Sequence, residues 1–207
     1  CVQALMPVPL PKGTGSALLL EVDGPESQVA READLLAEVC RAHGALEVRR
    51  ASDAHGRDDL WKLRRSISPG LRRLAPVKLN EDIVVPRNRL SDMFDFLADL
   101  AVRKLVAIVN FGHAGDGNIH VNIMISGTDA DETRRAHEAV EETFRKAVEV
   151  GGTISGEHGV GISKAPFFEM EVGPLGVAVM KRLKECFDPN GILNPGKIFL
   201  DEAAVRG

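Results

Sequence analysis

Two histidines, His113 and His120, stand at the ends of a short glycine-rich segment, His-Ala-Gly-Asp-Gly-Asn-Ile-His. Gly115 and Gly117 inside it permit a tight turn, so the chain can bring the two imidazoles near one point. Neutral imidazole is a ligand for transition metals, and a carboxylate could complete the set. The spacing therefore predicts a site for a divalent metal such as Zn, Fe or Mn.

The residues around His120 alternate in polarity. Ile119, Val121 and Ile123 are aliphatic, whereas His120 and Asn122 between them are polar. Successive side chains of a strand point to opposite faces. The pattern therefore predicts a strand with one face on a core, and with His120 and Asn122 directed towards a ligand or water.

A second glycine-rich segment, Gly151–Gly161, carries Glu157 and His158 side by side. Its glycines permit close backbone approach and unusual dihedral angles. Glu157 is a suitable carboxylate to join the two histidines as a metal ligand. His158 would then lie beside the metal and is a candidate general base.

Other interpretations of these residues stay open at this point. A single histidine is more often structural than functional, and a glycine-rich turn is usually only a turn. A metal-dependent hydrolase could use His113, His120 and Glu157 with an activated water, although the His-Glu-x-x-His signature is missing. A noncatalytic ferredoxin-like binding module is a third alternative.

Hydrophobic periodicity predicts the elements that position these segments. We expect strands at residues 17–22, 45–49, 78–85, 105–111 and 118–125. We expect helices at residues 27–42, from about 58 to 74, and at 88–104, 129–150 and 175–187. Pro69 should kink or interrupt the second of these helices.

The order of elements indicates an α+β fold, with an antiparallel or mixed sheet that carries helices on one face. We expect residues 16–207 to form a ferredoxin-like cap domain with a C-terminal helical segment. Residues 1–15 contain several prolines and glycines, and the chain begins with Cys1 and not with Met. We therefore expect them to be a linker from a preceding domain.

Composition argues against several classes of protein. The formal net charge is -4 and no long basic run occurs, so nucleic acid is not an expected partner. The apolar runs are too short to span a bilayer, and no signal peptide is visible. The three cysteines are widely spaced and fit reduced thiols. We expect a cytoplasmic protein, or one attached peripherally to the inner membrane face.

Several motifs follow one another along the chain: Leu60–Ile67, Asn80–Pro86, His113–His120, Gly156–Gly161 and Asp188–Lys197. Together they resemble the C-terminal domain of FAD-linked oxidases, the family of the glycolate oxidase FAD subunit, D-lactate dehydrogenase and D-2-hydroxyglutarate dehydrogenase. The similarity runs from about Leu18 to Phe199.

The resemblance implies a two-part enzyme, in which an N-terminal domain binds FAD and this part covers the flavin and holds the substrate. The metal ligands of the family match His113, His120 and Glu157. Asn122 and His158 match substrate-site residues. Arg64 matches an arginine that pairs with the substrate carboxylate, for which a bidentate guanidinium is well suited. Ser68, one helical turn further on, could add a hydrogen bond.

One position departs from the family pattern, because Asn80 stands where some relatives have a substrate-binding lysine. Lys78 lies two residues earlier, on the same strand face, and is the candidate here. Asn194 is a candidate contact to the cofactor. The implied reaction is oxidation of a D-2-hydroxy acid, such as glycolate or lactate, to the 2-oxo acid, with electrons passing from FAD to a further acceptor. Without the FAD-binding domain, we expect the chain to be inactive.

Overall fold

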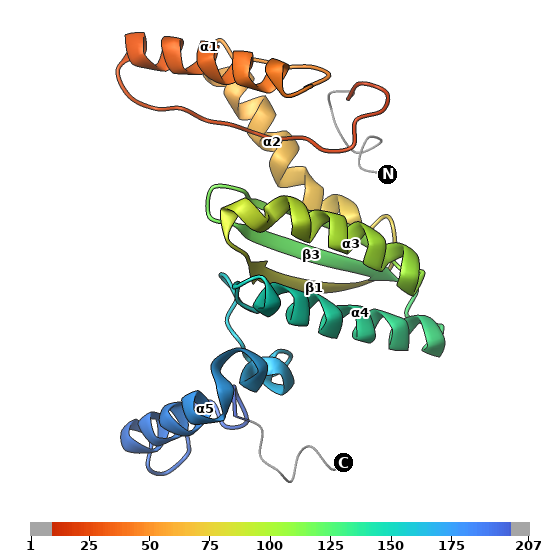
Figure 1. Ribbon diagram of the computed structural model, residues 1–207, viewed down its shortest axis with the longest axis vertical. Helices are drawn as coiled ribbons and strands as arrows, with labels where there is room; N and C mark the ends of the chain where they lie inside the picture. The colour runs from red at the N-terminus through yellow and green to blue at the C-terminus, as the bar shows by residue number, and fades with distance from the viewer. Residues whose placement is uncertain (1–9, 200–207) are drawn as a thin grey trace. The chain divides into compact units, whose positions relative to one another are not determined.

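The computed structural model describes residues 10–199, and these divide into two compact units. The first unit ends at Leu74 and the second begins at Ala75. Figure 1 draws both units. Cys1 and most of the expected linker lie outside the described residues.

The first unit contains two helices close to those predicted, α1 (Glu26–Ala42) and α2 (Ala54–Leu71). α2 begins four residues before the expected position because Asp53 caps it, its side chain accepting the backbone N–H of Gly56 at 2.8 Å. Pro69 lies in the last turn, and the helix ends two residues later at Leu71. The predicted interruption at this proline is therefore a helix end.

The strands predicted at residues 17–22 and 45–49 are wrong, since both segments are irregular. Leu18 is 66% exposed and Leu20 is 45% exposed, so the apolar run at the first site is not part of a core. A run of apolar residues forms a strand only where a neighbouring strand pairs with its backbone. The described residues of the first unit contain no such neighbour.

The second unit is built on an antiparallel sheet of β1 (Val77–Val84), β2 (Ala107–His113) and β3 (Asn118–Ile125), in the order β1-β3-β2. Between β1 and β2 lie the short 3-10 helix η2 (Arg87–Arg89) and α3 (Leu90–Lys104). After β3 comes α4 (Ala130–Glu149), and α3 and α4 pack on one face of the sheet (Figure 1). This confirms the predicted α+β class and the hairpin.

Alternation along the strands directs apolar side chains to the sheet face on which α3 and α4 pack. Ile83, Ile119, Val121 and Ile123 are fully buried on the helix side. They pack with buried residues of the helices: Met93, Leu97 and Leu100 of α3, and Ala136, Ala139, Val140, Phe144 and Ala147 of α4. The spacing in α4 is that of one helical face. The opposite sheet face keeps the polar side chains.

The outer edge of β1 holds the second glycine-rich segment. In a βαββαβ unit a last strand would pair with this edge. Here only a short bridge forms: Val84 N donates to Thr153 O at 3.1 Å, and Thr153 N donates to Val84 O at 2.8 Å. Residues that follow Thr153 can therefore bend around the strand towards the polar face.

The C-terminal helical segment consists of η3 (Ala165–Phe167) and α5 (Phe168–Phe187). Gly173 has a φ of 68° and breaks the helical geometry, and Pro174 follows. The helix predicted from the sequence began at Leu175, so it covered only the part of α5 that follows this break. Among residues 10–199, no helix is long and apolar enough to cross a bilayer, and Cys40 and Cys186 are free thiols.

Gly117 allows the β2–β3 turn to approach the end of β1. Its φ is +76°, its O accepts the N–H of Val85 at 2.9 Å, and an added Cβ would lie 2.0 Å from Val85 O. We expect Gly117→Ala to lower the free energy of unfolding by about 2–4 kcal/mol, through strain and the lost contact. Gly115→Ala is the matched control, because its Cβ would meet nothing within 4 Å. Urea unfolding that shows equal stability for the two variants would contradict this role.

Glu81 is a carboxyl group on the helix side of the sheet. It lies between Leu79 and Ile83 and faces Val121 in the register. Burial raises the pKa of Glu81 from 4.5 to about 7, the charge of Lys164 opposes this rise, and Asp82 adds to it. The folded chain therefore keeps a proton on Glu81 in a pH range where the unfolded chain has released it.

We expect the contribution of Glu81 to stability to fall as the pH rises from about 4.5 to about 7. The full shift corresponds to about 3 kcal/mol, and partial exposure reduces this to ~1–2 kcal/mol. Glu81→Gln mimics the protonated group. The free energy of unfolding of this variant, relative to that of wild type, should therefore rise by ~1–2 kcal/mol between pH 5 and pH 8. Urea unfolding at both pH values measures it, and a difference that does not depend on pH would count against the shift.

Candidate metal and substrate site

The register of the sheet places His113 and His120 together on its polar face. His120 lies opposite Asp82 of β1 and opposite Phe111 of β2. In the next row, Asn118 lies opposite His113. The hairpin therefore brings the two histidines to neighbouring positions on one face, as their spacing predicts.

Glu157 reaches this face from the second glycine-rich segment. Its Oε1 lies 3.4 Å from His113 Nε2, and its Oε2 lies 3.9 Å from His120 Nε2. One ligand atom from each of these three residues lies within 4.8 Å of the other two. His120 is buried, whereas His113 and Glu157 are about half exposed, so the group is open to solvent on one side.

This donor set fits a divalent metal. Zinc bound tetrahedrally at about 2.0–2.1 Å separates its ligand atoms by roughly 3.3 Å, so small side-chain movements would close the site. Two imidazoles and one carboxylate are also a common set in catalytic sites, with a further position left for water or substrate.

The environment of His120 keeps its ring neutral. Burial lowers the pKa of His120 below 6.5, and the nearby rings of His158 and His113 act in the same direction. The carboxylates of Glu157 and Asp82 oppose this effect without overcoming it. A neutral imidazole near pH 7 offers its lone pair to a metal without first losing a proton.

His158 also lies at this site. Its ring stacks on that of His120, with centroids 5.4 Å apart and planes inclined by 12°. The ring of His113 meets His120 edge-on at 5.7 Å, and Phe111 lies 5.3 Å from it. His158 is exposed, which is the position expected of a group that exchanges a proton with a bound substrate.

Asn122 and Lys78 extend the same face along the sheet. Asn122 is fully buried, and its Nδ2 donates to Val109 O at 3.0 Å and to His120 O at 2.9 Å. Its Oδ1 is buried without a hydrogen-bond partner among the described residues. Lys78 lies further from the histidines, opposite Met124. Their roles towards a substrate stay predictions.

The other predicted residues come from elsewhere in the chain. Arg64 and Ser68 lie one turn apart on α2 and belong to the first unit. Asn194 belongs to the second unit, has a φ of 48°, and lies in an exposed turn. Near that turn, Ile198 N donates to Gly161 O at 2.7 Å, which ties this segment to the end of the second glycine-rich loop.

Sequence reasoning missed Asp82 and Lys164, which are buried beside the site. Asp82 accepts hydrogen bonds from the backbone of the loop that carries Glu157, and Lys164 Nζ donates to Asp82 O at 2.8 Å. The available signal was an acidic residue on the polar face of β1, in line with Lys78 and Asn80. Nothing local indicated its partners.

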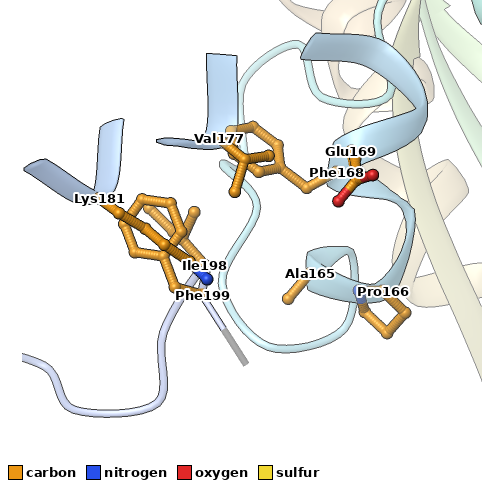
Figure 2. A pocket seen from close by; sticks show the side chains of 8 residues that line it. All are labelled: Ala165, Pro166, Phe168, Glu169, Val177, Lys181, Ile198 and Phe199. Carbon is orange, nitrogen blue, oxygen red and sulfur yellow. The ribbon is translucent and has the colours of Figure 1, made fainter. Parts of the chain in front are cut away.

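A pocket of about 320 Å³ is lined by residues of η3, α5 and the segment that ends at Phe199 (Figure 2). Its lining includes the apolar side chains of Phe168, Val177 and Phe199 and the charged side chains of Glu169 and Lys181. None of the predicted site residues lines it. We therefore assign it no part in the chemistry.

The chain matches the model of one known family. Residues 1–198 match the family described as FAD linked oxidases, C-terminal domain, and the chain belongs to it.

Relatives with assigned names are consistent with this family. The chain is 41% identical over 197 residues to the glycolate oxidase subunit GlcD of Bacillus subtilis, covering 95% of this chain and 42% of that protein. It is 35% identical to a probable mitochondrial D-lactate dehydrogenase of Danio rerio, covering 87% of this chain and 37% of that protein. It is 34% identical to D-lactate dehydrogenase of Anaerostipes hadrus, covering 89% of this chain and 39% of that protein. The chain thus spans about two fifths of the length of these relatives.

A solved structure shares the fold. The 4-ethylphenol oxidase from Gulosibacter chungangensis, in complex with isoeugenol, matches with a TM-score of 0.56 over 87% of this chain and 38% of that chain. The sequence identity is 15%, so the likeness concerns the fold alone.

Proposed function

We propose that this chain is the substrate- and metal-binding part of an FAD-dependent dehydrogenase that oxidises a D-2-hydroxy acid, such as glycolate or lactate, to the 2-oxo acid. The observation that carries the proposal is the convergence of His113, His120 and Glu157 on one sheet face, with His158 stacked beside them. The names of the relatives, glycolate oxidase subunit and D-lactate dehydrogenase, supply the class of substrate.

In this proposal His113, His120 and Glu157 hold the metal. A bound divalent ion supplies Lewis-acid polarisation of the substrate hydroxyl. A ring nitrogen of His158 accepts the hydroxyl proton as the C2 hydrogen leaves. The stacked position of His158 against His120 keeps that nitrogen next to the ligands, where the hydroxyl would bind.

Further residues orient the substrate. Arg64 pairs with the substrate carboxylate through its guanidinium, and Ser68 adds a hydrogen bond to the same group. Asn122 Oδ1, buried and without a partner among the described residues, is suited to accept a hydrogen bond. Lys78 adds positive charge on the same sheet face.

The proposal assigns most of the FAD binding to a preceding part of the polypeptide. The described residues contain no glycine-rich turn between a strand and a helix of the kind that binds dinucleotides. FAD supplies the hydride acceptor, and Asn194 of this chain is a candidate contact to it. The partners are that FAD-binding part, the hydroxy acid and an electron acceptor. A cytoplasmic or peripheral location remains part of the proposal.

Titration of the purified 207-residue chain with Zn²⁺ tests the site directly. We expect one equivalent to bind, with heat measured by calorimetry and with a rise in melting temperature, because a ligand stabilises the state that binds it. D-lactate or glycolate should then raise the melting temperature of the zinc-loaded chain further. A chain that binds no Zn²⁺ and whose melting does not respond to hydroxy acids would favour a noncatalytic module.

A further inference from the structure

We propose that Asp82 is a positioning residue for this site: its buried carboxylate holds the backbone of Gly156–His158 so that Glu157 and His158 face His120. The inference rests on the metal site proposed above, but its geometry is observed without any metal. Asp82 belongs to β1 and the loop lies more than seventy residues later, so the contact joins two distant parts of the chain.

One carboxylate oxygen of Asp82 accepts hydrogen bonds from three consecutive backbone N–H groups. Oδ2 accepts from Gly156 at 3.0 Å, from Glu157 at 2.6 Å and from His158 at 2.8 Å. Successive N–H groups that converge in this way form a concave anion site. The carboxylate thereby fixes the backbone of the two residues that supply a ligand and the candidate base.

The other oxygen links the carboxylate to the β2–β3 hairpin. Oδ1 accepts from Asn118 Nδ2 at 2.6 Å, and Asn118 lies opposite His113 in the register. Gly156 leaves room for this arrangement, because a Cβ there would lie 2.5 Å from Asn118 Nδ2 and 2.9 Å from Asp82 Oδ1. The buried carboxylate of Asp82 is thus hydrogen-bonded both to the loop of residues 156–158 and to the β2–β3 hairpin.

The burial of this charge is compensated. Asp82 is 0% exposed, and a buried carboxylate is costly unless it is paired and hydrogen-bonded. Lys164, also buried, lies with Nζ 4.0 Å from Oδ2 and donates to the Asp82 carbonyl. Burial by itself raises the pKa of Asp82, but the N–H groups of His158 and Glu157, the Asn118 amide and Lys164 hold it below 3.8. The group therefore stays ionised near neutral pH.

Asp82 also faces the inner nitrogen of a metal ligand. His120 Nδ1 lies 3.8 Å from Asp82 Oδ1 and is buried without a hydrogen-bond partner among the described residues. If Nε2 binds a metal, Nδ1 carries the proton and needs an acceptor. A small rotation of the ring would bring the two atoms into hydrogen-bond distance. Asp82 would then orient the ring as well as the loop.

A different role for Asp82 is direct ligation, because Asp82, His120 and His158 also offer ligand atoms within 4.8 Å of one another. The hydrogen bonds argue against it. Four donors already occupy the two carboxylate oxygens of Asp82, whereas Glu157 is half exposed and faces both His113 and His120.

The test compares Asp82→Asn with wild type, using Co²⁺ as the metal and amide hydrogen exchange of the metal-free chain. We expect the dissociation constant for Co²⁺ to rise about 10–100-fold, as for loss of a group that orients ligands. We also expect exchange of the amides of residues 156–158 to accelerate at least tenfold. The visible Co²⁺ spectrum should change shape, because the ligands are held less firmly. Asp95→Asn, the same change at an exposed position of α3, should leave all three readouts unaltered.

Asn118→Ala keeps the experiment decisive should Asp82→Asn fail to fold. It removes one hydrogen bond of the carboxylate, so we expect the same changes at smaller size, about two- to tenfold in Co²⁺ affinity. Complete loss of Co²⁺ binding in Asp82→Asn with unchanged loop exchange would make Asp82 a ligand and overturn the proposal. Unchanged affinity and exchange in a folded variant would also overturn it. If wild type itself binds no Co²⁺, the proposed metal site fails, while the exchange data still decide the positioning role.

Discussion

Replacing His120 by Ala should reduce the affinity of the chain for Zn²⁺ at least tenfold. His120 is the buried member of the proposed ligand set, and its Nε2 faces Glu157. Loss of a group that only orients ligands lowers metal affinity about 10–100-fold. Replacing His120 deletes a ligand itself, so the loss of affinity should be no smaller. His113 and Glu157 would remain as two half-exposed donors, which cannot enclose a metal.

Metal content after dialysis and calorimetric titration measure this effect. His137→Ala is the matched control, because it removes an exposed histidine from α4, on the other side of the sheet. The control should bind Zn²⁺ as wild type does. Equal zinc content in wild type and His120→Ala would show that the three residues do not form the site.

Replacing His158 by Ala should lower kcat of the complete, FAD-containing enzyme by about 10²-fold or more, as expected for loss of a general base. Replacing Arg64 by Ala should mainly raise KM, because a contact to the substrate carboxylate is present in both the ground state and the transition state. Arg64→Lys should recover only part of the loss, since an ammonium group lacks the planar fork of the guanidinium.

Steady-state kinetics with D-lactate or glycolate distinguish the two residues. A substrate amide in place of the acid is the control: it carries no carboxylate, so the identity of residue 64 should then have little effect. Near-normal turnover of His158→Ala would mean that the proton passes to another group. A fall in kcat for Arg64→Ala without a rise in KM would contradict the proposed division of roles.

Local sequence patterns predicted the part of the fold that carries the histidines. The alternation from Asn118 to Ile125 predicts β3 with its correct faces, because the period of a strand is a property of the strand itself. The helical spacing of residues 129–150 likewise predicts α4. The glycines between His113 and His120 predict the turn that brings both rings to one face.

One error of the sequence prediction concerns contacts between distant residues, and another concerns a break within a helix. Residues 17–22 have the composition of a strand, but a strand needs a partner that composition does not reveal. The start of α5 was missed because Gly173 and Pro174 resemble a helix boundary, whereas helix also precedes them. The break itself has a local cause in this glycine and proline, and the helical turns before it were not recognised.

Sequence patterns predicted the three proposed ligands as a group but did not indicate the buried residues beside them. Histidines and a glutamate between glycines are recognisable as possible donors wherever they occur. Asp82 and Lys164 act through hydrogen bonds that join residues more than seventy positions apart, and neither has a sequence neighbour that indicates its partner. Residues of this kind become visible only once the sheet register and the loop path are known.

The most direct measurement is the visible absorption of flavin in the full-length protein, recorded without oxygen before and after addition of a D-2-hydroxy acid. The proposed function predicts that D-lactate or glycolate bleaches the flavin, and that His158→Ala bleaches at least a hundredfold more slowly, in line with the role of a general base. A flavin that stays oxidised with every D-2-hydroxy acid offered, in a protein that retains its FAD and metal, would contradict the assignment of this chain to hydroxy-acid oxidation.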